Sequence, residues 1–309
     1  MAEAVDWDAE TARAIFDAAE TPIARAIVDE SLRREKLAAN AVPLPQSTRV
    51  LTISNQKGGV GKTTTTVNLA SALARSGARV LVIDLDPQGN ASTALGVDHH
   101  SETLSSYDVL VGDEPMAAVI RPSREESRLH CLPANIHLAG AEIELVSLVA
   151  REQRLQRALR AQLESMAEPY HYVFIDCPPS LGLLTINAFV AAQEVLIPIQ
   201  CEYYALEGLS QLLKNIDLIR THLNPQLTVS TILLTMYDGR TNLAQQVAQE
   251  VREHFPAEVL DAVIPRSVRV SEAPSYGQTV IEYDFESSGA LAYREAAAEI
   301  AVRGEREGR

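Results

Sequence analysis

The sequence predicts an α/β protein built on a mostly parallel, twisted sheet with helices on both faces. Short apolar runs rich in β-branched residues alternate along the chain with stretches of helical length and composition. Several of these runs are apolar at almost every position, which is typical of strands buried on both sides of a sheet. With 309 residues, 46% of them hydrophobic, the chain can bury such a core.

The elements are expected in a strand–helix alternation that starts near residue 49. The expected strands are Val50–Ser54, Val80–Ile83, Tyr172–Ile175, Val195–Ile199, Val229–Leu234 and Val259–Ile264. The expected helices are Lys62–Ser76, Ala139–Met166, Glu207–His222 and Leu243–His254. Alternation of this kind implies parallel pairing with right-handed crossovers. Ligands of such sheets bind at the carboxyl ends of the strands.

Residues 1–47 are expected to form an N-terminal extension, and residues 48–309 the main domain. Helix-forming residues occupy Thr21–Ala39, and Pro43 and Pro45 then interrupt any helix and form a short, stiff linker. The extension either packs on the main domain, is partly disordered, or docks another protein. The sequence leaves these alternatives open.

Composition limits the classes of function. The formal net charge of −14 argues against a basic surface over the whole protein, yet residues 206–270 hold six basic and seven acidic side chains, a net of −1, so a local basic patch stays possible. No apolar run reaches the roughly 20 residues of a membrane-spanning helix. Residues 1–10 carry no lysine or arginine, unlike a secretory signal. Cys131, Cys177 and Cys201 lack metal-ligand spacing and are expected as reduced, packed thiols of a cytoplasmic protein.

The segment 55–64, NQKGGVGKTT, joins an expected strand to an expected helix. Its glycines let the backbone approach an anion closely, and its N–H groups together with the helix start direct partial positive charge at phosphates. Lys62 adds a full charge for the β- and γ-phosphates, and the Thr63 hydroxyl is a magnesium ligand. The segment therefore predicts a triphosphate site. Its expected binding residues are Gly58, Gly59, Val60, Gly61, Lys62, Thr63 and Thr64.

Carboxylates follow two of the expected strands. In Asp84-Leu85-Asp86-Pro87, a bend at the proline can direct Asp86 alone into the site, while Asp84 supports either the magnesium shell or the loop. Asp176 ends the apolar run Tyr172–Ile175, as in a Walker B element, where the carboxylate accepts hydrogen bonds from magnesium-bound water. The expected metal residues are therefore Thr63, Asp86 and Asp176.

The phosphate loop departs from the pattern GxxxxGK[ST], because Gln56 replaces the first glycine and Lys57 adds a second lysine. With KGGVGKT it resembles the deviant Walker A loop of the ParA/MinD family. Three further segments resemble ParA chains of the chromosomal, Soj-like kind: residues 202–208 (EYYALEG), 234–241 (LTMYDGRT) and 264–274 (IPRSVRVSEAP). The resemblance covers about residues 48–302 and leaves the extension outside.

This resemblance implies a P-loop ATPase fold, ATP and Mg²⁺ as cofactors, and an ATP-dependent homodimer. It implies that Lys57 reaches the partner's nucleotide, that Asp86 orients the attacking water, and that the adenine lies near Thr235, Met236 and Pro265. It also implies binding of non-specific double-stranded DNA, slow hydrolysis stimulated by a ParB-type partner, and a place on the nucleoid. The implied catalytic residues are Lys57, Lys62 and Asp86, and the implied DNA-binding residues are Arg240, Arg269 and, as an auxiliary, Arg266.

Other classes of protein contain a phosphate loop of this kind. A MinD-like membrane ATPase needs a C-terminal amphipathic helix with lysines, whereas residues 293–302 are rich in alanine and glutamate. A nitrogenase-type reductase needs a suitably placed cysteine pair, which is not evident. A small-molecule kinase or ligase resembling dethiobiotin synthetase needs an acceptor-substrate motif, and none is evident. A scaffold that uses ATP only to dimerise would not need the set Lys62, Thr63, Asp86 and Asp176.

Overall fold

The computed structural model describes residues 22–203 and 205–307, and the chain divides into two compact units, Met1–Val42 and Pro43–Arg309. In the first unit, helix α2 (Pro22–Ala39) occupies most of the stretch in which a helix was predicted; Thr21 lies outside the described residues. Pro22 stands in the first turn, where its missing N–H removes no helical hydrogen bond. At the other end, the Asn40 side chain donates to the carbonyl of Lys36 over 2.7 Å.

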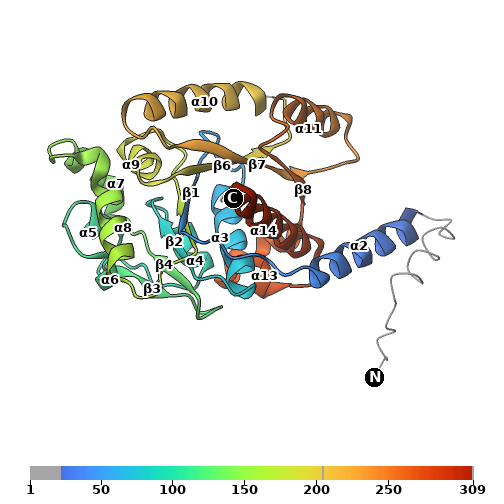
Figure 1. The fold of residues 1–309 in the computed structure, drawn as a ribbon, viewed down its shortest axis with the longest axis horizontal. Helices are drawn as coiled ribbons and strands as arrows, with labels where there is room; N and C mark the ends of the chain where they lie inside the picture. Colours follow the sequence, from blue (N-terminus) through green and yellow to red (C-terminus); the bar gives the residue numbers. More distant parts are fainter. Residues whose placement is uncertain (1–21, 204, 308–309) are drawn as a thin grey trace. The chain divides into compact units, whose positions relative to one another are not determined.

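The second unit contains an eight-stranded sheet in the order β3-β4-β2-β5-β1-β6-β7-β8 (Figure 1). All neighbouring strands pair in parallel except β3 and β4, which are antiparallel. The predicted fold class is confirmed. The strands are β1 (Arg49–Ile53), β2 (Val80–Asp84), β3 (Arg121–Pro122), β4 (Leu129–Leu132), β5 (Tyr172–Asp176), β6 (Glu194–Gln200), β7 (Thr228–Tyr237) and β8 (Val259–Pro265).

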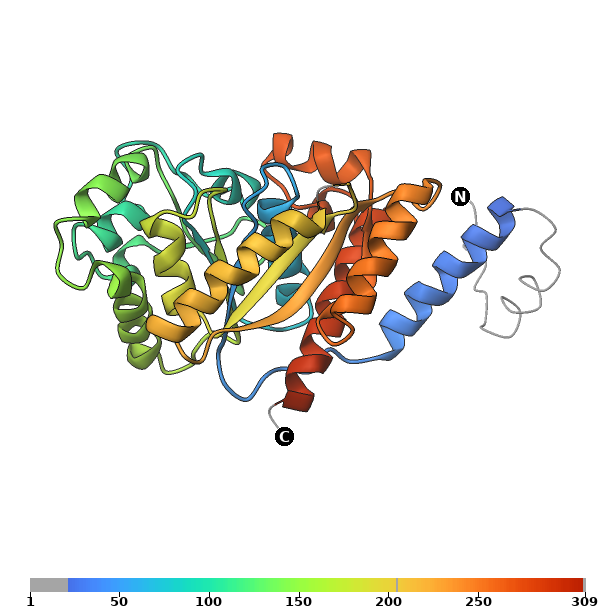
Figure 2. The same cartoon turned by 90° about the horizontal axis from the view of Figure 1, so that it is seen from above.

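Helices cover both faces of the sheet, which explains why β2 and β5 are buried at every position (Figures 1 and 2). Helices α3 (Lys62–Arg75), α13 (Val280–Tyr283) and α14 (Ser288–Glu307) pack together on one face. The other face is covered by α8 (Arg154–Ser165), α9 (Leu183–Ala191), α10 (Ala205–His222) and α11 (Asn242–His254).

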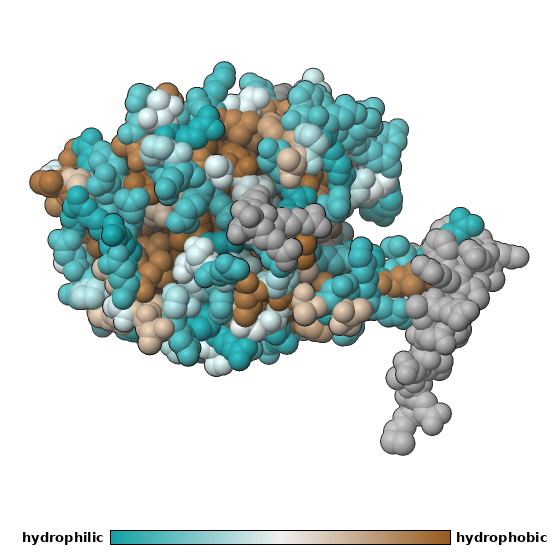
Figure 3. All heavy atoms as spheres, in the orientation of Figure 1, coloured by the Kyte–Doolittle hydropathy of each residue, from teal (hydrophilic) through white to brown (hydrophobic). Residues whose placement is uncertain are grey.

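The prediction of one continuous helix over Ala139–Met166 is wrong. The chain forms α7 (Leu138–Leu145), turns, and continues through a short 3₁₀ turn, η1 (Arg151–Gln153), into α8. Ala150 adopts a left-handed φ of 51°, which ends helical geometry there. The buried Asn187 of α9 stabilises the break, because its Nδ2 donates to the Arg151 carbonyl and its Oδ1 accepts from the Leu155 amide. Ile143 of α7 and Val146 and Val149 of the turn are exposed. Figure 3 shows hydrophobic residues on the surface at the left of the view, where Figure 1 places α7.

Several short elements escaped the sequence-based prediction. Strands β3 and β4 are only two and four residues long, and most of the missed helices are a single turn. Two longer helices were also missed, α9 with nine residues and α14 with 20. The other missed helical elements are α4 (Asn90–Ala94), α5 (Ser106–Leu110), α6 (Met116–Val119), α12 (Val268–Glu272), η2 (Ala273–Tyr276) and α13.

The apolar face of the C-terminal helix α14 packs inside the protein. Leu291, Tyr293 and Ile300 are almost fully buried where the helix packs on β8 and α3. That face is therefore not free to lie on a lipid surface. Across the part of the chain that the structure describes, no helix combines the length and the apolar character needed to cross a membrane.

Candidate functional site

The phosphate loop connects β1 to α3 at the carboxyl edge of the sheet. Gly59 and Gly61 adopt φ angles of 75° and 89°, a left-handed region in which a side chain is strained. A Cβ built on Gly58 or Gly59 meets nothing within 4 Å, so the space above these residues is open. Asn55 fixes the start of the loop, because its Oδ1 accepts from the Lys57 amide at 3.0 Å. The loop thus presents an open cradle of backbone N–H groups that fits phosphate oxygens.

Lys62, the first residue of α3, lies almost fully buried under this cradle, with 7% of its surface exposed. Its Nζ donates to the carbonyl of Lys57 over 3.3 Å. Burial lowers the pKa of Lys62, and the negative charges of Asp176 and Asp86 oppose that shift. A buried ammonium at the base of an open loop is suited to a multiply charged anion.

Thr63 and Asp176 meet directly. The Thr63 hydroxyl donates to Asp176 Oδ2 at 2.7 Å, and the Thr66 hydroxyl donates to Oδ1 at 3.2 Å. Asp176 is completely buried; burial raises its pKa, and the adjacent Asp84 carboxylate raises it further. A divalent cation would favour the ionised carboxylates and offset part of the cost of burying them.

Asp84 and Asp86 have different surroundings. Asp84 is fully buried, and its Oδ2 accepts from both the amide (2.9 Å) and the hydroxyl (2.7 Å) of Ser92, while its Oδ1 accepts from the Asp86 amide at 3.1 Å. Of its two predicted roles, these bonds favour support of the loop. Asp86 is only partly buried, and its Oδ1 accepts from the Gln88 amide at 3.0 Å. Asp86 therefore lies at the rim of the site, where a water can reach it.

The side chains expected to hold magnesium include one hydroxyl, of Thr63, and few carboxylates. Among the described residues, no group of three or more histidine, cysteine, aspartate or glutamate side chains is arranged to hold a metal ion. Magnesium in nucleotide sites usually keeps several waters and takes phosphate oxygens with one or two protein ligands. The Thr63 hydroxyl beside Asp176 fits this pattern, with Asp86 at the rim.

Lys57 differs from Lys62 in exposure and in partner. Its side chain is 42% exposed, and its Nζ forms an ion pair with Glu202 Oε2 at 2.6 Å. Glu202 follows β6, the neighbour of β1 in the sheet, so the pair joins the ends of two adjacent strands. The sequence shows Glu202 within a family-like segment, but pairing with Lys57 becomes evident only once the order of the strands is known.

The residues expected near the adenine lie at the ends of β7 and β8. Thr235 is buried, and its hydroxyl donates to the carbonyl of Val60 at 2.9 Å. Met236 has a left-handed φ of 50°, and its Cε lies 3.9 Å from the position of a Cβ on Gly61. Tyr237 is in register with Pro265. The structure thus brings Met236 against the phosphate loop and places Pro265 on the neighbouring strand.

The three arginines expected to bind DNA are exposed, and two of them are ion-paired. Arg240 makes two hydrogen bonds to Asp238, and these bonds lower the pKa of Asp238 to about 2. Arg269 lies 3.4 Å from Glu272 and 3.3 Å from Asp284. Arg266 follows β8, and its amide donates to the Tyr237 carbonyl. DNA phosphates would therefore compete with these carboxylates for Arg240 and Arg269. Arginine–phosphate contacts are then favoured only when several arginines bind the DNA at once.

Relatives of this chain carry the names of partition proteins. Residues 48–229 match the family described as AAA domain. The chain is 53% identical over 256 residues to the sporulation initiation inhibitor protein Soj of Bacillus subtilis, covering 83% of this chain and 99% of that protein. It is 51% identical over 255 residues to the chromosome partitioning protein ParA of Myxococcus xanthus, covering 82% of this chain and 88% of the relative. The chain belongs to the ParA/Soj family of partition ATPases.

Solved structures agree with this assignment at the level of the fold and the nucleotide. A Mycobacterium smegmatis protein named cobyrinic acid a,c-diamide synthase, with bound ATP analogue and magnesium, is 40% identical, with a TM-score of 0.71 and coverage of 85% of this chain and 98% of that one. The septum site-determining protein MinD of Pyrococcus horikoshii, complexed with Mg-ADP, is 28% identical, with a TM-score of 0.64 and coverage of 82% and 96%. The predictions of an ATPase and of ATP with Mg²⁺ as cofactors are confirmed at the family level.

Proposed function

We propose that this chain is an ATP-dependent switch in the segregation of a chromosome or plasmid. ATP and Mg²⁺ bind at the phosphate loop, two protomers associate around the nucleotides, and the dimer holds DNA without sequence preference. A ParB-type protein stimulates slow hydrolysis, after which the protomers separate and leave the DNA. The protein works in the cytoplasm on the nucleoid and does not bind the membrane.

The observation that carries this proposal is the different placement of the two lysines of one loop. Lys62 is buried below the phosphate cradle, where it serves the nucleotide of its own protomer. Lys57 stands at the exposed rim, where it can extend across an interface to a partner's nucleotide. Lys62 already supplies the buried charge for the protomer's own nucleotide, and the exposed, solvent-screened pair with Glu202 leaves Lys57 available to a second nucleotide. The arrangement therefore supports a site completed by two protomers.

The roles proposed for the remaining residues follow from their positions. Thr63 and Asp176 hold the magnesium ion and its waters, Met236 and Pro265 border the base, and Asp86 at the rim orients the attacking water. The DNA surface consists of Arg240, Arg266 and Arg269, doubled in the dimer. Arginine suits this task because its planar guanidinium bonds two phosphate oxygens at once.

DNA binding measured with ADP, with ATP and with a non-hydrolysable ATP analogue, each across a salt series, tests the proposal. We expect retention of DNA with ATP and the analogue, little with ADP, and a steep loss as salt rises. The variant Lys62→Ala should lose nucleotide binding and with it DNA retention. Equal DNA binding with ADP and ATP by the unmodified protein would contradict the proposed switch.

The diamide synthase name of the Mycobacterium smegmatis structure gives a ligase alternative a specific basis. A ligase couples ATP cleavage to an acceptor acid and an amide donor, so its phosphate release depends on both. A partition switch releases phosphate without either. Phosphate release that requires an added acid and amide donor would favour the ligase, and release stimulated by DNA with a ParB-type protein would favour the switch.

A further inference from the structure

Helix α3, which starts at the phosphate loop, is hydrogen-bonded to α13. Helix α13 and Arg269 both belong to the segment of residues 268–284. The linking side chain is Asn68, which is 2% exposed. Its Nδ2 donates to the carbonyl of Thr64 at 2.7 Å, and its Oδ1 accepts from the amide of Val280 at 2.8 Å. A single amide group therefore connects the first turn of α3 with the first residue of α13.

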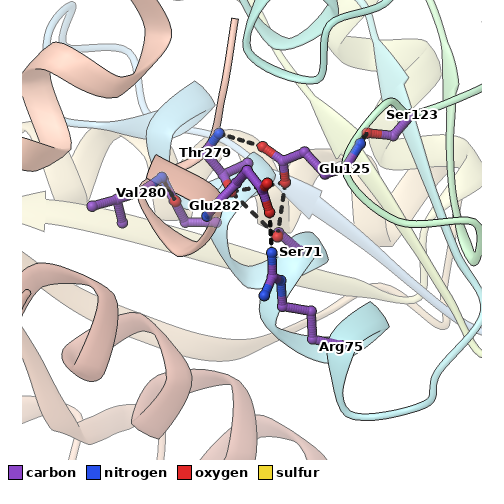
Figure 4. A network of polar contacts seen from close by, with 8 residues as sticks. Ser71, Arg75, Ser123, Glu125, Thr279, Val280 and Glu282 are labelled. Atoms are coloured by element: carbon purple, nitrogen blue, oxygen red, sulfur yellow. Dashed lines mark hydrogen bonds and ion pairs between the residues drawn. The ribbon is translucent and has the colours of Figure 1, made fainter. Parts of the chain in front are cut away.

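Glu125 makes a second bridge between the same two elements (Figure 4). Its Oε2 accepts from the Ser71 hydroxyl of α3 at 3.0 Å and from the Thr279 hydroxyl at 2.9 Å, and its Oε1 accepts from the Thr279 amide. Thr279 is the N-cap of α13 and is 1% exposed. Arg75 of α3 and Glu282 of α13 form an ion pair on the outer side of this bridge.

The Glu125 carboxylate makes this bridge sensitive to any movement of α13 along α3. Burial raises the pKa of Glu125, and the hydrogen bonds from Thr279 and Ser71 lower it. Glu125 is partly buried, and a carboxylate withdrawn from water is destabilised when it loses its donors. If α13 shifted along α3, these donors would no longer meet the carboxylate. The bridge therefore favours one position of α13 on α3.

Arg269 is attached to this fixed helix. Its guanidinium lies 5.9 Å from the centre of the Tyr283 ring, at the end of α13, and 3.3 Å from Asp284. The same segment also contacts α4, the helix that follows the loop of Asp86, through η2. Residues 268–284 thus contact both helices that leave the candidate nucleotide loops.

We propose that Asn68 and Glu125 are positioning residues that fix residues 268–284 to helix α3. The position of Arg269 then depends on which nucleotide, ATP or ADP, is bound at the phosphate loop where α3 begins. Neither side chain contacts DNA or nucleotide in this proposal. They transmit the position of α3 to α13 and, through Tyr283 and Asp284, to the arginine. The inference rests on the proposed function and assigns to it a structural connection between ATP and DNA.

The test measures one ratio, the DNA affinity with the ATP analogue divided by the DNA affinity with ADP, at one salt concentration. In the unmodified protein the analogue should strengthen binding. In Glu125→Ala this ratio should fall by about tenfold, a usual size for a coupling between two sites. Nucleotide affinity, measured with a fluorescent ATP analogue, and dimer mass, measured by light scattering, should stay unchanged. The conservative Glu125→Gln should restore most of the ratio, because its amide oxygen still accepts from Thr279.

The matched control is Glu126→Gln, since the neighbouring Glu126 carboxylate bonds locally to Ser127 and Arg128. If Glu125→Ala fails to fold, Ser71→Ala removes one donor of the same bridge and leaves the Thr279 N-cap of α13 in place. An unchanged ratio in the variant that folds overturns the inference, and so does a parallel loss of nucleotide binding or dimer mass, which would indicate general structural support. Absence of any nucleotide effect in the unmodified protein would contradict the proposed function itself.

Discussion

Lys57 and Glu202 form an ion pair within one protomer, with Nζ 2.6 Å from Oε2. The lysine that the proposed function directs to a partner's nucleotide is thus held by a carboxylate of its own chain. Both side chains are more than two-fifths exposed, at 42% and 47%, so solvent weakens their attraction. Such a pair can retain the lysine before association and release it at little cost.

Glu202→Gln should therefore favour the ATP-dependent dimer. Each of the two protomers gives up one exposed pair that contributes less than about 1 kcal/mol, so the dissociation constant of the dimer should fall by no more than roughly thirtyfold. Sedimentation with a non-hydrolysable ATP analogue measures this change. Glu207→Gln, an exposed carboxylate of α10, is the control, and Lys57→Ala should abolish the dimer. A weaker dimer for Glu202→Gln would indicate that Glu202 assists association.

Asp86→Ala should slow hydrolysis and leave nucleotide binding intact. The carboxylate lies at the rim rather than under the phosphate cradle, and positioned acid–base groups typically contribute about a hundredfold or more to rate. The variant should remain an ATP-bound dimer on DNA long after the unmodified protein has dissociated. Phosphate release and DNA dissociation, followed in parallel, check this. Turnover at the normal rate would remove Asp86 from the proposed role.

The chemistry of the site was more predictable from sequence than its connections. The phosphate loop and the meeting of Thr63 with Asp176 follow from local spacing and from the rule that parallel strands present their carboxyl ends at one edge. The Lys57–Glu202 pair requires the order of β1 and β6, which sequence does not give. The bridges from Asn68 and Glu125 to α13 join residues more than 150 positions apart in the chain.

The helix wrongly predicted over Ala139–Met166 also shows that sequence does not reveal contacts between distant elements. Residues 139–166 have the composition of one helix, but the turn at Ala150 is stabilised by Asn187, a residue of another helix. Tertiary hydrogen bonds outweighed local propensity there, because a single buried amide satisfies backbone groups on both sides of the break.

Arg269→Glu should remove DNA retention while sparing ATP hydrolysis measured without DNA. If Arg269 binds one phosphate in each protomer, its loss should reduce the slope of log affinity against log salt by about two for the dimer. Arg220→Glu is the control, since Arg220 is an exposed arginine of α10 that is likewise paired, with Asp217. An unchanged slope for Arg269→Glu would move the DNA surface to another part of the protein.

The contribution of His171 to the stability of the main domain should be lost as pH drops below the usual histidine pKa of about 6.5. The raised pKa values of the buried Asp84 and Asp176 act in the opposite direction, so this contribution is measured against a variant. His171 Nδ1 accepts a hydrogen bond from the Arg79 amide at 2.8 Å, which a protonated ring cannot do. Burial and the charge of Arg79 lower the pKa of His171, so the unfolded chain binds the proton more readily and acid favours unfolding. His171→Asn places an amide oxygen where Nδ1 stood, keeps the acceptor and does not titrate. Thermal unfolding at pH 7.5 and 5.5, values on either side of that pKa of about 6.5, should show that acid lowers Tm less, or raises it more, in the variant than in the unmodified protein. An equal change in Tm would contradict the role of His171.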